Sequence, residues 1–396
     1  MRFALHRGSG RSGEIRQAAV PYWALWVSCF LGYTAIGMTI QVIPTYARER
    51  IGADAVAAGL AVTIGSLATM VARPIAGRIA DRKGGRPVVM VGSILGCVGG
   101  LAHLIATNIP MLIVARLILG AGEGALFTAA IGWVLSDADP ARRGKIAGHF
   151  GLSMWTGLAG GPVLGAALLA LSGYRAVWLA ACFLPAVAWL ILLRSPRATL
   201  TSADQDVDRA LLPSAAWVPG ISMAFSSIGY GVIAAFLVPR FVSLDLPGHE
   251  FALAVFGAAF LLMRFVGSPM VDLWGAPFVL ALALTVEAIG LLGLFATINT
   301  CLVFICTALS GVGISMLYPC LASLVTDSAP AHERSAAIGA MTSAWDLGLA
   351  VGGPLGGLVA GSMNAGPFAL GAAGAIIAML PVAARARRSV ALSRRS

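Results

Sequence analysis

Six ionisable residues lie inside long apolar stretches of the sequence, where charge is otherwise rare. They are Arg73, Arg116, Glu123, Arg264, Glu287 and Asp346. A carboxyl group surrounded by hydrocarbon favours its protonated form, whereas a nearby arginine or bound cation favours the carboxylate. Such a group can therefore take up and release a proton as its surroundings change. Because charge is costly in an apolar medium, each of the six also needs a partner, water or a function.

Glu123 and Arg116 are seven residues apart, which places them on one face of a helix and separates them by roughly 10 Å along its axis. We predict that Glu123 carries a coupling proton and that Arg116 tunes it; a permanent structural ion pair is the alternative. Asp346, beside Trp345, is the second acid that we predict to exchange a proton.

The elements that position these residues must be apolar helices. The 396 residues are 58% hydrophobic and only 11% charged, with a mean hydropathy of +0.87, which excludes a soluble domain with a polar surface. The net charge of +10 does not indicate nucleic-acid binding, because the basic residues fall in short loops between apolar segments. We expect the lipid bilayer to be the surroundings of most of this chain.

Apolar runs of about 20 residues, the length that crosses a bilayer, recur along the chain. Only helices satisfy backbone polar groups over such lengths in hydrocarbon, so an all-α integral membrane fold is predicted. The twelve predicted segments are 20–43, 55–79, 87–107, 109–135, 145–171, 174–194, 215–242, 250–272, 277–298, 300–326, 335–361 and 365–384.

A polar interval divides these segments into six and six. We predict an N-terminal six-helix bundle over 1–194, a linker over 195–214 and a C-terminal six-helix bundle with a basic tail over 215–396. Six is even, so both halves enter the membrane in the same sense, as parallel repeats around a central cavity. Matches at a constant offset of 191 support the duplication. They include Arg73 with Arg264, Asp81 with Asp272, Gly120 with Gly311, Gly148 with Gly339, Gly157 with Gly348 and Gly161 with Gly352.

Orientation follows from the basic residues. They gather at both ends of the chain and in one alternate set of loops, whereas the other loops hold only Arg48, Arg50, Arg175 and Arg240. This asymmetry predicts that both termini are cytoplasmic, in a multi-pass protein of the plasma (inner) membrane. The first apolar run is too long for a signal peptide, so we expect it to be retained as a helix.

The segment 77–87 concentrates charge and helix breakers between two apolar runs. Asp81 ends a predicted helix, where its carboxylate can accept from Arg82 or Arg86 or lie against the positive N-terminus of another helix. Either contact would act as a latch between moving parts. A loop whose bases only enforce topology is the alternative, and it is our preferred interpretation of Lys83.

Small residues mark the fifth predicted helix. Three of its glycines share one face at four-residue spacing, which lets helices approach closely, and a proline removes a backbone donor and bends the segment. We predict a helix-packing role for Gly148, Gly157, Gly161, Pro162 and Gly165; the eleventh helix repeats the arrangement with Gly348, Gly352, Gly353, Pro354 and Gly357.

These motifs resemble those of the major facilitator superfamily over essentially the whole chain. The loop motif matches Gly77, Asp81, Arg82, Gly84 and Arg86, with Gly85 where a base is usual. The helix-four motif matches Arg116, Gly120 and Gly122. The helix-five motif matches Gly148, Gly157, Gly161, Pro162 and Gly165, with Ala166 in the last place. This last pattern looks like that of exporters, especially the drug:proton antiporters with twelve helices.

The resemblance implies roles for further residues. Helices one, four, seven and ten would line the cavity, so the candidate substrate contacts are Tyr33, Gln41, Tyr230 and Tyr318, with Trp155 and Trp345 from flanking helices. The latch, formed by Gly77, Asp81, Arg82 and Arg86, would close the cytoplasmic side in the outward-facing state. Glu287 would lie on a scaffold helix as a neutral, hydrogen-bonded group, and Arg73 and Arg264 would brace the loop motifs.

Enzyme chemistry finds no support in the sequence. The run 120–124 superficially matches a dinucleotide loop but lies inside an apolar segment without a preceding strand. All six cysteines fall in predicted helices at spacings that do not suit a metal site, so we expect no metal and no cofactor.

Together these patterns predict a proton-coupled secondary transporter that exports small amphipathic or drug-like molecules by alternating access. Its partners would be a small-molecule substrate, protons and the lipid bilayer, with no nucleic acid, and we expect a monomer. Two alternatives remain: a proton-coupled symporter that imports a sugar or other metabolite, and a non-transporting membrane receptor on the same fold.

Overall fold

The computed structural model describes residues 20–53, 55–195, 212–248, 251–360 and 365–393, and every long element in these ranges is an α-helix. The helices are α1 (Tyr22–Glu49), α2 (Ala55–Lys83), α3 (Gly85–Ile105), α4 (Ile109–Ser136), α5 (Arg143–Leu193), α6 (Trp217–Ser243), α7 (Ala252–Trp274), α8 (Ala276–Ala296), α9 (Thr300–Ser328), α10 (Arg334–Ala360) and α11 (Gly366–Ser393). The all-α prediction is confirmed.

The label α5 covers two predicted segments. Its chain turns at Gly173, whose φ of 74° lies in the left-handed region that glycine adopts without a Cβ penalty. Dividing α5 there gives twelve helical segments, as the sequence predicts. By length and hydropathy alone, eight helices of the described chain could cross a membrane. Several helices run past their predicted ends, α2 to Lys83 for example, because a hydrophobicity criterion ends where polar residues begin although the helix continues.

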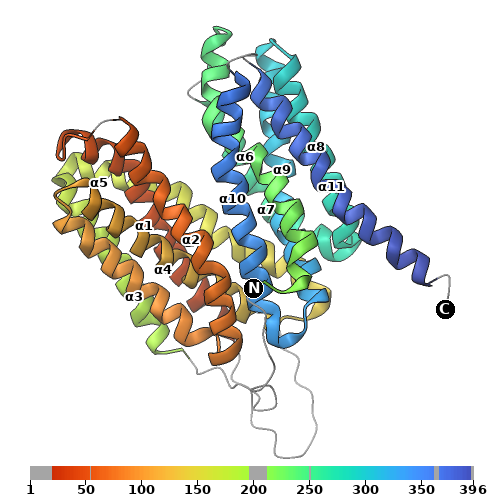
Figure 1. The fold of residues 1–396 in the computed structure, drawn as a ribbon, viewed down its shortest axis with the longest axis horizontal. Helices are drawn as coiled ribbons and strands as arrows, with labels where there is room; N and C mark the ends of the chain where they lie inside the picture. The colour runs from red at the N-terminus through yellow and green to blue at the C-terminus, as the bar shows by residue number, and fades with distance from the viewer. Residues whose placement is uncertain (1–19, 54, 196–211, 249–250, 361–364, 394–396) are drawn as a thin grey trace, which may run out of the picture.

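The twelve segments form two bundles, α1–α5 and α6–α11, drawn in red to yellow-green and in green to blue in Figure 1. The same pairs of elements pack together in each bundle. In the first, α1 packs on α5 and α4 packs on both α2 and α3; in the second, α6 packs on α10 and α9 packs on both α7 and α8. This equivalence is the structural form of the 191-residue repeat. The predicted linker 195–214 lies almost entirely outside the described residues, so its boundaries remain a prediction.

The bundles contact each other mainly through α2 with α10 and α5 with α7, and also through α5 with α9 and α4 with α10. The bundles meet where α2 ends and α10 begins, and they diverge toward the other end, so the molecule has the outline of a V (Figure 1). Close approach at the junction depends on small residues. A side chain at Gly77 would strike the backbone of Ser335, and one at Gly148 would strike the side chain of Ser268. We name this region the junction of the two halves.

Within the first bundle, α5 lies directly against α1 over several turns. A Cβ at Gly157, Gly161 or Gly165 would collide with α1 backbone atoms, whereas one at Gly160 would meet nothing within 4 Å. The glycines predicted to serve packing therefore lie where two helices need them, and Pro162 lies inside the same stretch of helix.

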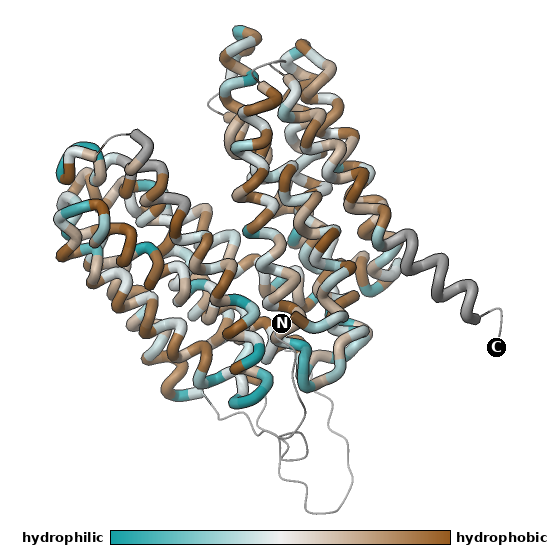
Figure 2. Tube along the Cα trace, viewed as in Figure 1, coloured by the Kyte–Doolittle hydropathy of each residue, from teal (hydrophilic) through white to brown (hydrophobic). Residues whose placement is uncertain are grey.

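Hydropathy follows the architecture. Apolar residues run along the helices, and most of the hydrophilic residues gather in the turns at the ends of the bundles, with isolated patches within them (Figure 2). Leu171, Phe183 and Leu273 are among the large apolar side chains that point outward. An apolar exterior of this kind suits a hydrocarbon solvent.

Candidate functional site

An ion pair links the two halves deep in the protein. The Nε atom of Arg73, on α2, donates to Oδ2 of Asp346, on α10, at 2.7 Å. The two side chains are only 5% and 10% exposed. We expected Arg73 to brace the loop motif; it instead holds the acid that the sequence singled out on the opposite half. Both charges would be costly if left alone at this depth, so each stabilises the other.

Glu123 lies close to this pair. It is half-buried on α4, and the hydroxyl of Thr69, on α2, is 3.3 Å from its Oε2. Thr69 is also 2.9 Å from the carbonyl of Gly120. Glu123 interacts electrostatically with both Arg73 and Asp346. We therefore define the acid–base cluster as Glu123, Arg73 and Asp346. The structure brings the two predicted acids together and adds an arginine to which the sequence gave another role.

Arg116 has a different set of contacts. Its guanidinium donates to the carbonyl of Ala61 at 3.3 Å and to the hydroxyl of Thr39 at 3.3 Å, and it lies against Gly65. Arg116 thus ties α4 to α1 and α2 within the first half. Arg116 remains within electrostatic range of Glu123. Both residues lie on one face of α4, as their seven-residue spacing predicts.

Three of the six predicted substrate contacts meet in one aromatic cluster. Trp345 and Tyr230 rings lie 5.2 Å apart between centroids, and Trp155 lies 5.9 Å from Trp345 and 5.7 Å from Tyr230. Phe260 approaches Trp155 at 4.5 Å and Phe256 approaches Tyr230 at 5.8 Å. We name these five residues the aromatic cluster. Trp155 comes from the first half and the other four from the second, so the cluster spans both halves.

Two other predicted contacts belong to a second ring group. Tyr33 lies 5.8 Å from Phe127, and Phe127 lies 5.9 Å from Tyr318, which again crosses from one half to the other. Both tyrosine hydroxyls are buried and have no hydrogen-bond partner among the described residues. Gln41, the sixth predicted contact, is exposed on α1 and belongs to neither ring group.

Arg264, on α7, connects the two ring groups. Its guanidinium carbon lies 5.1 Å above the ring of Phe260 and 5.8 Å above that of Tyr318. The side chain is 1% exposed. We expected it to brace a loop motif; it instead lies among aromatic rings. The sequence contained a signal for this difference, because the repeat that pairs Arg73 with Arg264 pairs Asp346 with Trp155, which is not an acid.

At the junction, Asp81 lies against a helix N-terminus. Its two carboxylate oxygens accept from the backbone N–H groups of Ser335 at 3.0 Å and Ala336 at 2.8 Å, the first turn of α10. This is the second of the two contacts that the sequence allowed. A carboxylate at this position satisfies free N–H groups and the positive end of the helix dipole.

Asp272 repeats the arrangement in the other direction. Its oxygens accept from the N–H groups of Gly144 and Lys145, both at 2.8 Å, in the first turn of α5. Residues 144 and 145 are 191 positions before 335 and 336, so the two contacts are equivalent under the repeat. An ion pair between Arg143 and Asp327, at 2.8 Å, also crosses the junction.

The remaining residues of the loop motif differ in position. Arg86 donates to the carbonyls of Leu192 at 3.4 Å and Leu193 at 3.0 Å, which joins the start of α3 to the end of α5 inside one half. Arg82 is exposed. Gly77 provides the close approach to Ser335 described above. Asp81 and Gly77 are therefore the members of the predicted latch whose recorded contacts cross the junction.

Glu287 is fully buried on α8, away from the acid–base cluster. It accepts a hydrogen bond from the hydroxyl of Ser226, on α6. A group of this kind, bonded within one half, fits the structural role expected for it. Among the described residues, no group of three His, Cys, Asp or Glu side chains is placed to hold a metal ion.

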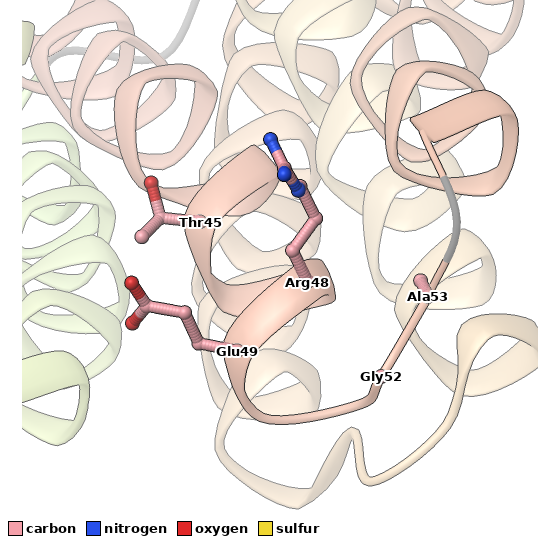
Figure 3. A pocket seen from close by; sticks show the side chains of 5 residues that line it. All are labelled: Thr45, Arg48, Glu49, Gly52 and Ala53. Carbon is pink, nitrogen blue, oxygen red and sulfur yellow. The ribbon is translucent and has the colours of Figure 1, made fainter.

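A hollow of about 540 Å³ lies at the end of α1 and the turn that follows it. Figure 3 shows Thr45, Arg48 and Glu49 on the last turns of α1, with Gly52 and Ala53 on the turn. All five residues come from one short segment of the first half. The acid–base cluster and the aromatic cluster take residues from both halves, whereas the residues that line this hollow come from the first half.

Comparison with known proteins shows similar sequences and similar folds. The family model described as Major Facilitator Superfamily matches residues 25–245 and 219–395. The uncharacterized MFS-type transporter YhhS of Escherichia coli (strain K12) is 30% identical over 361 residues, covering 89% of each chain. An uncharacterized MFS-type transporter of Salmonella typhimurium is 29% identical over 349 residues, covering 86% of this chain and 90% of the relative.

Solved structures share the fold. The transporter FucP in the outward conformation superimposes with a TM-score of 0.75 at 16% identity, over 92% of this chain and 98% of FucP. The proton:xylose symporter XylE superimposes with a TM-score of 0.74 at 14% identity, over 91% of this chain and 94% of XylE.

Proposed function

Because the chain belongs to the major facilitator superfamily of membrane transporters, we propose that it is a proton-coupled secondary transporter that exports small amphipathic molecules by alternating access. The observation that carries this proposal is the acid–base cluster. This cluster has two carboxyl groups and one arginine at the contact between the halves. Protonation of a carboxyl group there would weaken its attraction to the arginine of the other half or of the neighbouring helix.

The ion pair between Arg73 and Asp346 stabilises the present contact of α2 with α10. Protonation of Asp346 would remove the charge attraction and leave a weaker hydrogen bond, which favours movement of one half against the other. Glu123 is the second acid within electrostatic range of the same arginine. Two acids that share one arginine titrate as a coupled set, so a proton taken up by one changes the affinity of the other.

The junction contacts support an alternating-access cycle. Asp81 and Asp272 each bind the N-terminus of a helix in the opposite half, so both contacts must break when the V closes at its open end and opens at the junction. The distribution of basic residues puts the junction on the cytoplasmic side. With that orientation, the described conformation corresponds to an outward-facing state.

Export is the direction that the fifth helix supports. Its glycine and proline pattern is similar to that of exporters, and these glycines pack α5 against α1 without room for side chains. A tight seal along one side of the pathway would limit leakage of protons and substrate during the cycle. The aromatic cluster, with half-buried Trp155, Tyr230 and Trp345, offers apolar faces to an amphipathic substrate.

A flux experiment in proteoliposomes tests the proposal. Purified protein of known orientation would be reconstituted with a pH-sensitive dye inside, and a chemically varied library of small molecules would be added to each side. Substrates should move protons in the opposite direction through the wild-type protein, and Glu287→Gln should behave as the wild type. Proton movement in the same direction as substrate would instead identify an importing symporter. If no compound of the library caused proton movement, the proposed class of substrate would be contradicted.

A further inference from the structure

Arg264 is a buried cation that has no acidic partner among the described residues. Its Nε and Nη1 atoms are inaccessible and have no hydrogen-bond partner in the part of the chain that the structure describes. The groups with which it interacts electrostatically are Tyr318 and Cys320, and neither side chain is ionised at neutral pH. Stacking on Phe260 and Tyr318 offsets only a part of the cost of burying a guanidinium.

The internal repeat identifies the position at which an acidic partner of Arg264 would be expected. In the first half, Arg73 receives the carboxylate of Asp346 from the opposite half. Arg264 is the equivalent arginine of the second half, and the residue equivalent to Asp346 is Trp155. The two arginines therefore have the same place in the repeat, but within the described part of the chain Arg73 alone of the two has an acidic partner.

The groups around Arg264 indicate what kind of ligand could supply the missing negative charge. Nη1 faces α5 at Gly151, where a Cβ would lie 3.7 Å from it, so the guanidinium points toward the opposite half. Two buried polar groups in these surroundings also have no hydrogen-bond partner among the described residues: the hydroxyl of Tyr318, over whose ring Arg264 lies, and the indole N–H of Trp155. Phe260, on which Arg264 stacks, is in turn 4.5 Å from the Trp155 ring.

We propose that Arg264 binds the anionic group of the transported molecule, and that the substrate is a small organic anion with an aromatic or extended apolar body. This inference rests on the proposed transport function and names its substrate class. A guanidinium offers two parallel N–H groups to a carboxylate, and hydrogen bonds between charged groups are among the strongest in proteins. The aromatic cluster beside Arg264 would hold the apolar body, and the indole N–H of Trp155 would add a donor to the anion.

An inorganic anion does not account for the whole arrangement. Chloride would neutralise Arg264 but would leave the half-buried faces of Trp155, Tyr230 and Trp345 without an apolar partner. These three rings lie within ring-to-ring contact of one another, and Trp155 also contacts Phe260, the ring over which Arg264 lies. The charge and the rings together favour an ion that carries a hydrophobic group.

Equilibrium dialysis on the full chain in lipid nanodiscs, without a proton gradient, measures this directly. The probes are 1-naphthoate, its neutral amide 1-naphthamide, and acetate. Wild-type protein should bind naphthoate at least about tenfold more tightly than the amide, as expected for one charge-assisted hydrogen-bonded pair. Acetate should compete weakly. Equal affinity for naphthoate and its amide, or competition by acetate at the same concentration as naphthoate, would overturn the proposal.

Substitutions separate the charge from the fold. Arg264→Gln should reduce the preference for naphthoate over the amide to about one while the amide still binds, and Arg264→Lys should keep a part of it. Arg240→Gln is the matched control, because it removes another buried arginine of the second half, one that donates to the carbonyls of Phe295 and Thr297. Full preference in Arg264→Gln would exclude this arginine as the anion site.

A second pair of variants keeps the inference testable if Arg264→Gln does not fold. Trp155→Asp would place an acid where the repeat has Asp346, so it should pair with Arg264 and abolish the preference for naphthoate. Trp155→Asn matches that aspartate in size without its charge, so it should bind both probes more weakly, because the indole is lost, but should still bind naphthoate more tightly than the amide. Anion preference with no proton flux would overturn the transport proposal alone, whereas proton flux that depends on Glu123 without anion preference would overturn this inference alone.

Discussion

At the scale of single residues, the protein uses a small number of buried charges, and their value depends on partners from the opposite half. Asp346 lies on α10, and its carboxyl group is paired with Arg73 on α2. Breaking a buried pair by removing one member leaves an uncompensated charge, which is more harmful than removing both. A substitution of Arg73 or Asp346 alone should therefore destabilise the protein more than a substitution of both residues by apolar ones.

The first prediction concerns Glu123. Glu123→Gln should abolish uphill, proton-driven transport while substrate binding and downhill exchange continue, because the amide keeps hydrogen bonding to Thr69 but cannot titrate. The measurement is substrate accumulation with and without an imposed pH gradient. Glu287→Gln, a buried acid in contact with Ser226, is the control and should do much less. Uphill transport at full coupling in Glu123→Gln would move the proton site to Asp346.

The second prediction uses the pair itself. Asp346→Asn should destabilise the protein, because Arg73 loses its counter-ion, by about 3–5 kcal/mol if no water or other group compensates. Arg73→Met combined with Asp346→Leu should recover most of this loss in thermal unfolding, yet should not transport uphill. Recovery of coupled transport by the apolar pair would show that the pair serves stability alone.

The residue scale is also where the sequence was least sufficient. Depth and rarity of charge were enough to single out Glu123 and Asp346, because hydropathy is local information. The same criteria did not identify the partner of Asp346, because Arg73 is 273 residues away and only the contact of two helices brings it near. Phe127 and Phe260 were missed for the same reason: an apolar ring in an apolar helix carries no signal until its neighbours are known.

At the scale of elements, helices were predicted well and their contacts less well. A 20-residue apolar run must be a helix in hydrocarbon, so all twelve segments could be read from composition. The turn at Gly173 and the backbone N–H groups that bind the Asp81 side chain depend on how helices pack. The repeat was the most useful guide, since it paired Asp81 with Asp272 and both residues cap a helix of the other half.

The third prediction tests these caps. Asp81→Asn should shift the equilibrium away from the described conformation while folding is largely retained, because the side chain keeps its shape but one of its two acceptors becomes a donor. The accessibility of single cysteines placed in the junction should rise. Asp272→Asn should act in the same direction. Unchanged accessibility together with normal transport would exclude the latch role.

The fourth prediction concerns the packing of α5 on α1. Gly161→Val should lower stability by about 1–3 kcal/mol, because its Cβ would strike the backbone of Thr34 and Gly37. Gly160→Val is a control on the adjacent position, with nothing within 4 Å of its Cβ, and should be close to neutral. Thermal unfolding of both variants in the same detergent is the measurement. Equal stability would contradict the close approach of the two helices.

At the scale of the whole molecule, orientation in the membrane is the property that the fold alone does not decide, because both ends of the V carry polar turns. The positive-inside rule decides it from the loops. Reporter fusions after residue 209 and after Ser396 should both read cytoplasmic, and one near Gly248 should read external. An external reading at the C-terminus would contradict an even number of crossings.

The unequal partners of the two equivalent arginines have a consequence for the history of the chain. A duplicated half begins with identical residues, and two identical halves would face the membrane centre with the same charges. Here one copy of the position has become Asp346 and the other Trp155. Asp346 pairs with Arg73, and in our proposal the substrate anion pairs with Arg264. The two halves of the proposed transporter have thus diverged in role, so that proton coupling and substrate binding use different arginines.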